Sequence, residues 1–240
     1  MKTVIIAAGE GNRLWGKTNG KPKTLLPFGR GSLLSTILSN FKSIGLDQFV
    51  LVLGYQAEII EQYVRRNLPE TDVEIVYNND WRKGNGISAL TARSAVGKES
   101  FILSMSDHLV SSMALRTVKN ADANRNSLLV DFRLDKVYDL DDATKVRVDN
   151  HRIRHIGKEI KDFNAVDCGI FKLTERFFIA MQNQINCGAD SISAGITELI
   201  RRDDMFAIPM AANDLWIDVD TPQAYHFAEK YFIAQNENNR

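Results

Sequence analysis

Residues 3–11 read TVIIAAGEG, and this stretch decides the fold. Its first six residues are apolar and rich in β-branched side chains, which is typical of a strand buried on both faces. Two glycines follow at once, as in a loop whose backbone N–H groups approach an anion closely. We therefore expect a central strand that leads directly into a glycine-rich, anion-binding loop.

Similar short apolar runs recur at residues 49–53, 73–77 and 101–105. Helical patterns separate them. In residues 32–44 the apolar positions follow the 3.6-residue period, with Ser32 available as N-cap and Gly45 placed to end the helix. Strands alternating with helices form parallel sheets whose ligands bind beyond the carboxyl ends of the strands. The pattern predicts an α/β fold with a Rossmann-like three-layer α/β/α architecture.

The second half of the chain is less regular. Thr221-Pro222 can open a last helix, with Thr as N-cap and Pro at the first helical position. We expect a mixed, mostly parallel central sheet within one domain of residues 1–240. The patterns predict a strand at 127–131, a hairpin at 145–156, helices at 176–185 and 193–201, and strands at 206–210 and 215–219.

Composition excludes several classes of function. The 240 residues carry 30 Lys+Arg and 30 Asp+Glu, so no long-range basic field attracts nucleic acid or an anionic membrane. Cys168 and Cys187 lack the spacing of a zinc site and favour a reducing compartment. The N-terminal apolar run is too short for a secretory signal, and no run approaches the roughly 20 residues of a membrane span. We expect a soluble, cytoplasmic protein.

Three phosphate-binding motifs compete in residues 9–23. The dinucleotide fingerprint requires a third glycine where Leu14 stands, which makes that interpretation weak. Residues 11–18 match the P-loop spelling, but the NGKP sequence after them disfavours the helix that a P-loop must open. The third motif, Gly-x-Gly-x-Arg-Leu followed by Pro-Lys, supplies the rigid fork of Arg13 and the mobile charge of Lys23. Together they suit a triphosphate.

Three aspartates follow predicted strands. Asp107 lies just past the strand at 101–105, while Asp218 and Asp220 flank Val219 at another strand end. Carboxylates at one sheet edge offer the oxygen ligands that Mg²⁺ prefers. We expect a Mg²⁺ site made by these three residues, with Asp218 favoured over Asp220 because Asp220 is equally suited to cap the last helix.

The motif segments together resemble the sugar-nucleotidyltransferase family over nearly the whole chain. The resemblance rests on residues 7–14, Pro22-Lys23, Leu26-Pro27, Asp107 and the segment WIDVDTP at 216–222. Within the family, residues 85–88, 105–108, 143–148, 156–158, 166–169 and 218–222 are most similar to cytidylyltransferases that act on inositol-1-phosphate. The resemblance implies transfer of CMP from CTP to inositol-1-phosphate by in-line attack, giving CDP-inositol and pyrophosphate. The N-terminal half would bind the nucleotide and the C-terminal half the acceptor.

The resemblance also implies roles for individual residues. Lys23 and Arg13 would be catalytic, because they neutralise charge on the α-phosphate and on the leaving pyrophosphate. Lys158 would hold the acceptor phosphate, and Lys145 would assist it or lie on the surface. Asp167, polar in an apolar run, would bind polyol hydroxyls. The nucleotide-binding set would be Ala7, Ala8, Gly9, Gly11, Asn12, Asn78, Asn85 and Gly86.

Other functions stay open beside this one. Gly157 stands where hexose-specific members carry an acidic residue, which weakens glucose-1-phosphate as acceptor. Phosphocholine needs an aromatic or acidic cage, and no clear aromatic set for one stands out. A nucleotide-sensing subunit without activity would not need the intact Arg13, Lys23 and Asp107. A P-loop ATPase or kinase is a distant fourth interpretation.

Two further expectations concern the surface and the partners. His151 and His155 would lie too far apart on a strand to share a metal ion, so we expect surface residues. The aromatic residues of the last helix pack in the core or form a homodimer face. The product would pass to a membrane-embedded transferase. These aromatic residues are Tyr225, Phe227, Tyr231 and Phe232.

Overall fold

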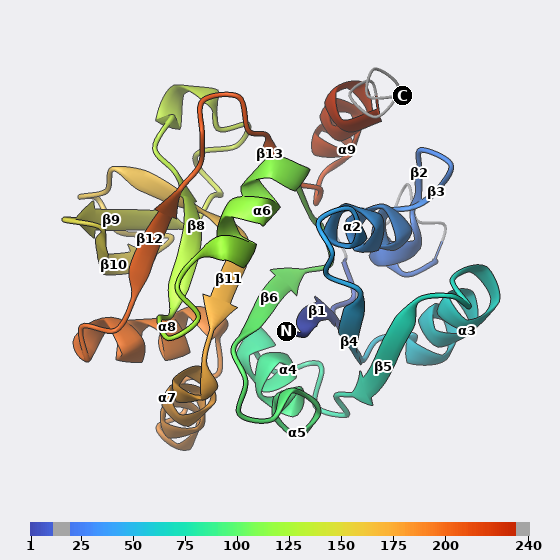
Figure 1. The fold of residues 1–240 in the computed structure, drawn as a ribbon, viewed down its shortest axis with the longest axis horizontal. Helices are drawn as coiled ribbons and strands as arrows, with labels where there is room; N and C mark the ends of the chain where they lie inside the picture. The colour runs from blue at the N-terminus through green and yellow to red at the C-terminus, as the bar shows by residue number, and fades with distance from the viewer. Residues whose placement is uncertain (12–19, 234–240) are drawn as a thin grey trace.

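The computed structural model describes residues 1–11 and 20–233, with a nine-stranded sheet at its centre (Figure 1). The N-terminal half supplies four parallel neighbours, with β1 between β4 and β6 as expected for a central strand. In spatial order the strands are β5 (Asp72–Tyr77), β4 (Gln48–Leu53), β1 (Thr3–Ala7), β6 (Phe101–Met105), β11 (Ala165–Leu173), β8 (Ser127–Asp131), β12 (Phe206–Pro209), β10 (Arg152–Gly157) and β9 (Lys145–Asp149).

The sheet as a whole is mixed. Among the described residues four of its strand pairings are parallel and five are antiparallel. The expectation of a mostly parallel sheet therefore holds for the first four strands but not for the whole. The reason is β11, which enters the sheet after the β9–β10 hairpin rather than after a crossover helix, and so runs antiparallel to β6 and β8.

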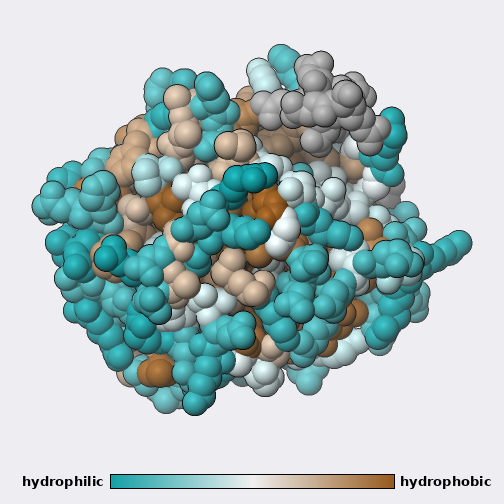
Figure 2. Space-filling model, in the orientation of Figure 1, coloured by the Kyte–Doolittle hydropathy of each residue, from teal (hydrophilic) through white to brown (hydrophobic). Residues whose placement is uncertain are grey.

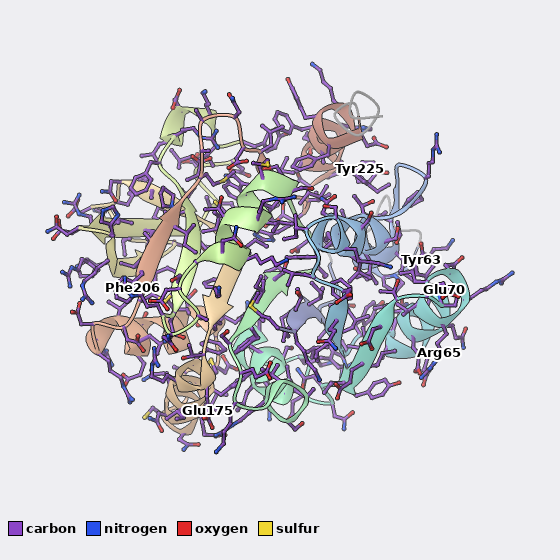
Figure 3. The ribbon with its side chains drawn as sticks, in the orientation of Figure 1. Tyr63, Arg65, Glu70, Glu175, Phe206 and Tyr225 are labelled. Atoms are coloured by element: carbon purple, nitrogen blue, oxygen red, sulfur yellow. The ribbon has the colours of Figure 1, made fainter. Side chains whose placement is uncertain are left out.

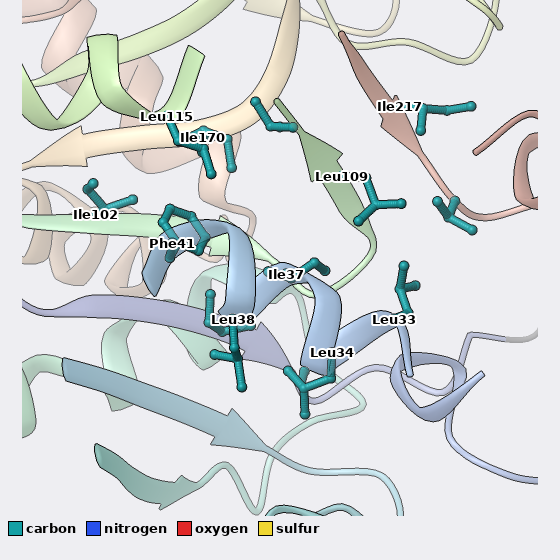
Figure 4. Packing of buried hydrophobic residues seen from close by; sticks show 14 of the residues in the cluster. Leu33, Leu34, Ile37, Leu38, Phe41, Ile102, Leu109, Leu115, Ile170 and Ile217 are labelled. Atoms are coloured by element: carbon teal, nitrogen blue, oxygen red, sulfur yellow. The ribbon is translucent and has the colours of Figure 1, made fainter. Parts of the chain in front are cut away.

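Helices cover both faces of the sheet, as predicted. Alternate residues of β1 separate the two layers: Ile5 packs in one hydrophobic cluster while Val4 and Ile6 pack in the other. Figure 4 shows α2 laying its apolar face on the first cluster. That cluster takes α2 (Leu33–Lys42), α3 (Ala57–Asn67), α6 (Ser112–Asn120) and α9 (Pro222–Ala228), and the second takes α4 (Asn85–Thr91), α5 (Arg93–Val96), α7 (Glu175–Asn186) and α8 (Ile192–Arg201).

The helix ends follow the chemistry of their sequences. Ser32 caps α2 with a reciprocal capping box to Ser35, and Gly45 follows that helix with a φ of 73°. Thr221 caps α9, accepting a hydrogen bond from the Ala224 N–H. These caps were predicted from the sequence. No helix in the described part of the chain is long and apolar enough to span a membrane.

Short elements complete the structure and flank the carboxyl edge of the parallel strands. The strand predicted at 215–219 is β13, which pairs with β7 in a separate two-stranded sheet outside the main sheet. The β9–β10 hairpin turns at Asn150 and His151, both at positive φ, and His155 is exposed as predicted. The short elements are η2 (Lys23–Leu25), β2 (Pro27–Phe28), β3 (Gly31–Ser32), β7 (His108–Val110), η3 (Leu134–Lys136), β13 (Trp216–Asp218) and η4 (Glu229–Ile233).

The aromatic residues of the last helix divide between core and surface. Tyr225, labelled in Figure 3, is buried and donates a hydrogen bond to the Pro27 carbonyl of β2. Phe232 is buried too, so packing explains these two. Tyr231 is exposed beside Phe227, whose ring also meets Tyr138. On the face drawn in Figure 2 hydrophilic residues predominate and apolar ones are scattered among them.

Candidate active site

Two adjoining cavities open at the carboxyl edge of β1 and β6. The first, of about 380 Å³, lies between the loop after β1 and helix α4. The second, of about 290 Å³, lies between β11 and the β7–β13 pair. The residues that line both cavities are Asn85, Met105, Asp107 and Asp220. Two ligands bound in these cavities would therefore meet at one shared wall.

The glycine loop packs tightly against the predicted catalytic lysine. Gly11 has a φ of 69°, and a Cβ on it would lie only 2.6 Å from the Cβ of Lys23. Only glycine allows this approach. Ala7, Gly9 and Gly11 line the first cavity, as predicted. Asn12 and Arg13 lie outside the described residues, and so does the segment that spells the P-loop, apart from Gly11.

Lys23 stands at the meeting point of the cavities, in an ion-paired cluster. Its Nζ donates to Asp107 Oδ2 at 2.7 Å and lies 3.9 Å from Asp218 Oδ1. His108 Nδ1 lies 2.9 Å from Asp107 Oδ1. Burial alone would raise the pKa of Asp107, but Lys23 and His108 hold it well below its usual range. Asp107 is therefore a carboxylate throughout the physiological pH range.

The other two groups of the cluster have raised pKa values. Burial and the nearby charge of Asp107 raise the pKa of Asp218 to about 6. Burial alone would lower the pKa of His108, but the charges of Asp218 and Asp107 raise it to about 9. A raised pKa fits the expectation that the histidine need not serve as a general base.

The arrangement of the carboxylates fits a divalent cation. Ligand atoms of Asp107, His108 and Asp218 lie within 4.8 Å of one another. Asp218 Oδ1 is buried and accepts no hydrogen bond from residues 1–11 or 20–233, which is costly for a carboxylate oxygen unless a cation neutralises it. Asp220 lines both cavities but is not part of this three-residue group. The cap of α9 is Thr221, so Asp220 does not serve as that cap.

One predicted base-binding residue, Asn85, lines the wall of the first cavity. It does so together with Ser88, which was not singled out from the sequence. Asn78 lies behind the wall, where its Nδ2 donates to Ser88 Oγ at 2.8 Å. Gly86 is also behind the wall, because its N–H bonds the Asp190 carbonyl and leaves no room for a Cβ. Ala8 is buried, and its carbonyl accepts from the Tyr55 N–H.

Two of the three predicted acceptor residues line the second cavity and one does not. Lys158 and Asp167 line the second cavity. Lys158 Nζ bonds Asp142 Oδ1 at 2.6 Å, while burial raises the pKa of Asp167 to about 6 against the opposing hydrogen bond from Gly169. Lys145 does not line the cavity, since its Nζ donates to the Asp141 carbonyl at 2.6 Å. The structure therefore brings together two of the three predicted acceptor residues.

Several lining residues were not singled out from the sequence. Gly169 has a φ of 74° and supports the His108 ring, whose Cδ2 a Cβ there would approach to 2.2 Å. The DWRKGNG run could have suggested the loop before α4, since its glycines precede a helix, but no spacing rule identifies the other residues. The additional residues are Trp81 and Lys83 in the first cavity, and Tyr138, Asp139, Asp142, Ser193 and Trp216 in the second.

Comparisons with known proteins agree with this geometry. Bifunctional IPC transferase and DIPP synthases from Aquifex aeolicus and Archaeoglobus fulgidus are each 29% identical to the chain, over 96% and 98% of it. The chain covers 51% and 44% of those relatives, so it spans about half their length. The inositol-1-phosphate CTP transferase from T. maritima is 26% identical, with a TM-score of 0.81 and 95% of both chains covered.

The fold extends to more distant structures. A UDP-glucose pyrophosphorylase complexed with UDP-glucose has a TM-score of 0.81 at 17% identity, covering 98% of each chain. The sequence model of the nucleotidyl transferase family matches residues 2–235. This match takes in nearly the whole chain, including the glycine loop, Lys23 and the aspartate cluster. The chain belongs to the nucleotidyl transferase family.

Proposed function

We propose that this protein transfers CMP from CTP to inositol-1-phosphate, releasing pyrophosphate and CDP-inositol. The observation that carries the proposal is the meeting of two cavities at Asp107, where Lys23 of the first cavity pairs with Asp107 and lies 3.9 Å from Asp218 of the second. One cavity has the glycine loop expected for a triphosphate, and the other has a lysine and a carboxyl group suited to a phosphorylated polyol. The relatives named IPC transferase and the T. maritima inositol-1-phosphate CTP transferase support this choice of substrates.

The reaction needs positioning and charge neutralisation rather than a covalent enzyme intermediate. An oxygen of the acceptor phosphate attacks the α-phosphorus of CTP, and the bond from that phosphorus to the bridging oxygen of the β-phosphate breaks. Lys23 neutralises charge that develops on the α-phosphate, and Arg13 neutralises the leaving pyrophosphate. The acceptor phosphate is already ionised near pH 7, so no strong general base is required.

We assign Mg²⁺ to the aspartate cluster. The buried and unbonded Oδ1 of Asp218 and the carboxylate of Asp107 would hold it, with Asp220 on the shared wall as a further oxygen donor. A bound Mg²⁺ would screen the triphosphate oxygens. In the structure Lys23 Nζ neutralises the same carboxylates, so a change of partner for Lys23 accompanies nucleotide binding.

The remaining residues would bind the two substrates. Ala7, Ala8, Gly9, Gly11 and Asn12 would contact the nucleotide with backbone and side-chain groups, and Asn78, Asn85 and Gly86 would form or support the base-binding wall. Lys158 would hold the acceptor phosphate after release from Asp142, with Lys145 opposite Gly157 on the paired strand β9. Asp167 would accept hydrogen bonds from polyol hydroxyls.

A second acceptor class has structural support. Tyr138 and Trp216 line the second cavity together with Asp139 and Asp142. Aromatic faces and carboxylates bind quaternary or primary ammonium groups, so phosphocholine is the alternative acceptor. The sequence did not reveal this set because Trp216 lies more than 70 residues after Tyr138, Asp139 and Asp142.

The test is release of pyrophosphate with Mg²⁺, measured for each of the four nucleoside triphosphates. Each is paired with inositol-1-phosphate, phosphocholine, glucose-1-phosphate and mannose-1-phosphate. Release only with CTP and inositol-1-phosphate supports the proposal. Release with phosphocholine selects the alternative acceptor, and absence of release in every combination refutes transferase activity.

The proposal treats residues 1–240 as one nucleotidyltransferase domain, with its N-terminal half for the nucleotide and its C-terminal half for the acceptor. The product would be taken up by a membrane-embedded transferase. Exposed Tyr231, with Phe227 and Tyr138 beside it, would form the face of a homodimer. Equilibrium sedimentation of the protein tests the last point.

A further inference from the structure

The base-binding wall presents hydrogen-bond groups of fixed polarity. Asn85 Oδ1 accepts from the Ile192 N–H at 2.9 Å. An N–H can pair only with the oxygen of an amide, so this bond fixes which way the Asn85 amide is turned. Its Nδ2 has no hydrogen-bond partner within the described ranges, although the residue lines both cavities. Asn85 therefore offers a donor to a ligand.

Ser88 offers a second donor. Its Oγ accepts from Asn78 Nδ2 at 2.8 Å. The orientation of the Asn78 amide is fixed as well, because its Oδ1 accepts a hydrogen bond from the Asp80 N–H at 2.9 Å. Nδ2 is therefore the atom that faces Ser88. With its oxygen engaged, the Ser88 hydroxyl has its hydrogen left to donate, and Ser88 lines the first cavity. Asn85 and Ser88 are three residues apart on α4, so they lie on the same face of the helix.

The wall is held rigidly by a segment from the other half of the molecule. The Gly84 N–H donates to Asp190 Oδ2 at 2.8 Å, and the Gly86 N–H donates to the Asp190 carbonyl at 2.8 Å. A Cβ on Gly86 would lie 2.6 Å from that carbonyl oxygen. These contacts flank Asn85 on both sides. The donors are thus oriented before any ligand binds, which is a condition for discrimination between ligands of similar shape.

Two adjacent donors match one nucleobase. Cytosine carries two adjacent acceptors, N3 and O2, on its Watson–Crick edge. Uracil carries a hydrogen on N3 between two carbonyl oxygens, guanine carries a hydrogen on N1, and adenine has a single acceptor on that edge. A donor facing an N–H group leaves both buried polar groups unpaired.

We propose that Asn85 Nδ2 and Ser88 Oγ select cytosine by donating to its N3 and O2. This inference rests on the proposed function, since it takes the first cavity as the nucleotide site. It adds a reason for the choice of CTP, namely that the wall offers hydrogen-bond donors to the base. Asn78, Asp80 and Ile192 are the residues that orient these donors.

The first test changes the ligand and leaves the protein intact. In 3-deaza-CTP a C–H group replaces N3, which removes one acceptor. The expected result is a kcat/KM for 3-deaza-CTP lower than that for CTP by about tenfold to a hundredfold, the usual effect of one lost hydrogen bond in a closed site. Equal use of the two nucleotides overturns the inference.

The second test changes the protein. Asn85→Asp keeps the acceptor for the Ile192 N–H but turns the outward group into an acceptor, so the ratio of kcat/KM for CTP over UTP should fall by about a hundredfold or more. Ser88→Ala removes the donor to O2, an oxygen that uracil also carries, so it should lower kcat/KM for CTP by about tenfold and leave the ratio nearly unchanged. Asn186→Asp, a change of the same type at an exposed position at the end of α7, is the control and should keep the wild-type ratio.

The outcomes separate this inference from the proposed function. Wild-type protein that uses CTP while Asn85→Asp keeps its CTP to UTP ratio, or while Ser88→Ala keeps its kcat/KM for CTP, overturns the inference and leaves the transferase activity standing. A wild-type protein that prefers UTP also overturns the inference while leaving the transferase activity standing. Wild-type protein inactive with every nucleotide overturns both. Should the variants lose their melting transition, the 3-deaza-CTP comparison decides alone.

Discussion

Replacement of Lys23 by methionine removes the positive charge where the two cavities meet. Met keeps the length of the apolar stem, so packing against Gly11 is retained. Loss of one charged donor to a transition-state oxyanion costs about 3–4 kcal/mol, which corresponds to a fall in kcat of about 10²- to 10³-fold. Pyrophosphate release at saturating CTP and acceptor measures this fall.

The same substitution has a separate effect on the apo protein. Lys23 Nζ lies 2.7 Å from Asp107 Oδ2 and 3.9 Å from Asp218 Oδ1, so its loss leaves two carboxylates facing each other. The Lys23 and Asp107 side chains are 12% and 23% exposed, so the destabilisation should be about 1–2 kcal/mol, below that of a fully buried pair. Mg²⁺ should bind the variant more tightly in the absence of nucleotide, because it no longer competes with the ammonium group.

The control is Lys21→Met, the same change at an exposed lysine two residues earlier. It should alter kcat by less than about twofold, since Lys21 is exposed and does not line either cavity. A Lys23→Met variant that keeps near-wild-type kcat would refute the role given to Lys23. A normal kcat in that variant together with an inactive Lys17→Ala variant would instead favour the P-loop interpretation of the glycine segment.

Three further predictions concern the metal site and the stability of the fold. Asp218→Asn should raise the Mg²⁺ concentration for half-maximal activity by about tenfold or more, and an unchanged Mg²⁺ titration would contradict the metal assignment. Burial alone would raise the pKa of Asp131, but hydrogen bonds from Arg133 and from the Trp216 ring lower it, so the carboxylate stabilises the fold above about pH 4 and this stability is lost as pH falls through the lowered pKa. Asp131→Asn should therefore flatten the dependence of unfolding free energy on pH between about 5 and 2, as urea denaturation at a series of pH values would measure. Lys172 is buried and donates to the Lys119 carbonyl at the end of α6, so Lys172→Met should lower the unfolding free energy by about 1–3 kcal/mol, and an unchanged urea midpoint would contradict this.

The N-terminal half of the fold was predictable because its signals are local. The apolar run of β1, the period of α2 and the Ser32 cap each depend on neighbouring residues. The same holds for Thr221 and Pro222 at the start of α9. The position of β11 was not predictable, because its antiparallel entry beside β6 depends on the path of a hairpin that no local pattern reveals.

The candidate site shows the same division. Asp107 follows β6, so its place at the sheet edge could be inferred from the strand alone. Lys145 was expected either to assist at the acceptor or to lie on the surface, and the structure pairs it with a backbone carbonyl of the preceding loop, outside the second cavity. Trp81 and Tyr138 reach the cavities from irregular segments, whose course is set by tertiary contacts.

The orientation of Asn85 illustrates what structure adds to a motif. The family resemblance implied that Asn85 binds the nucleotide, yet an amide can donate or accept equally well. The Ile192 N–H, more than 100 residues away in the chain, decides between the two. Long-range hydrogen bonds of this kind carry specificity and leave no spacing signal.

The most direct test of the central claim is ³¹P NMR of the reaction of CTP and inositol-1-phosphate with Mg²⁺ and the wild-type protein. Attack of the acceptor phosphate on the α-phosphorus predicts equal amounts of a diphosphate diester and of pyrophosphate, with no CMP. Formation of CMP, of CDP with inorganic phosphate, or of no product from these substrates would contradict it.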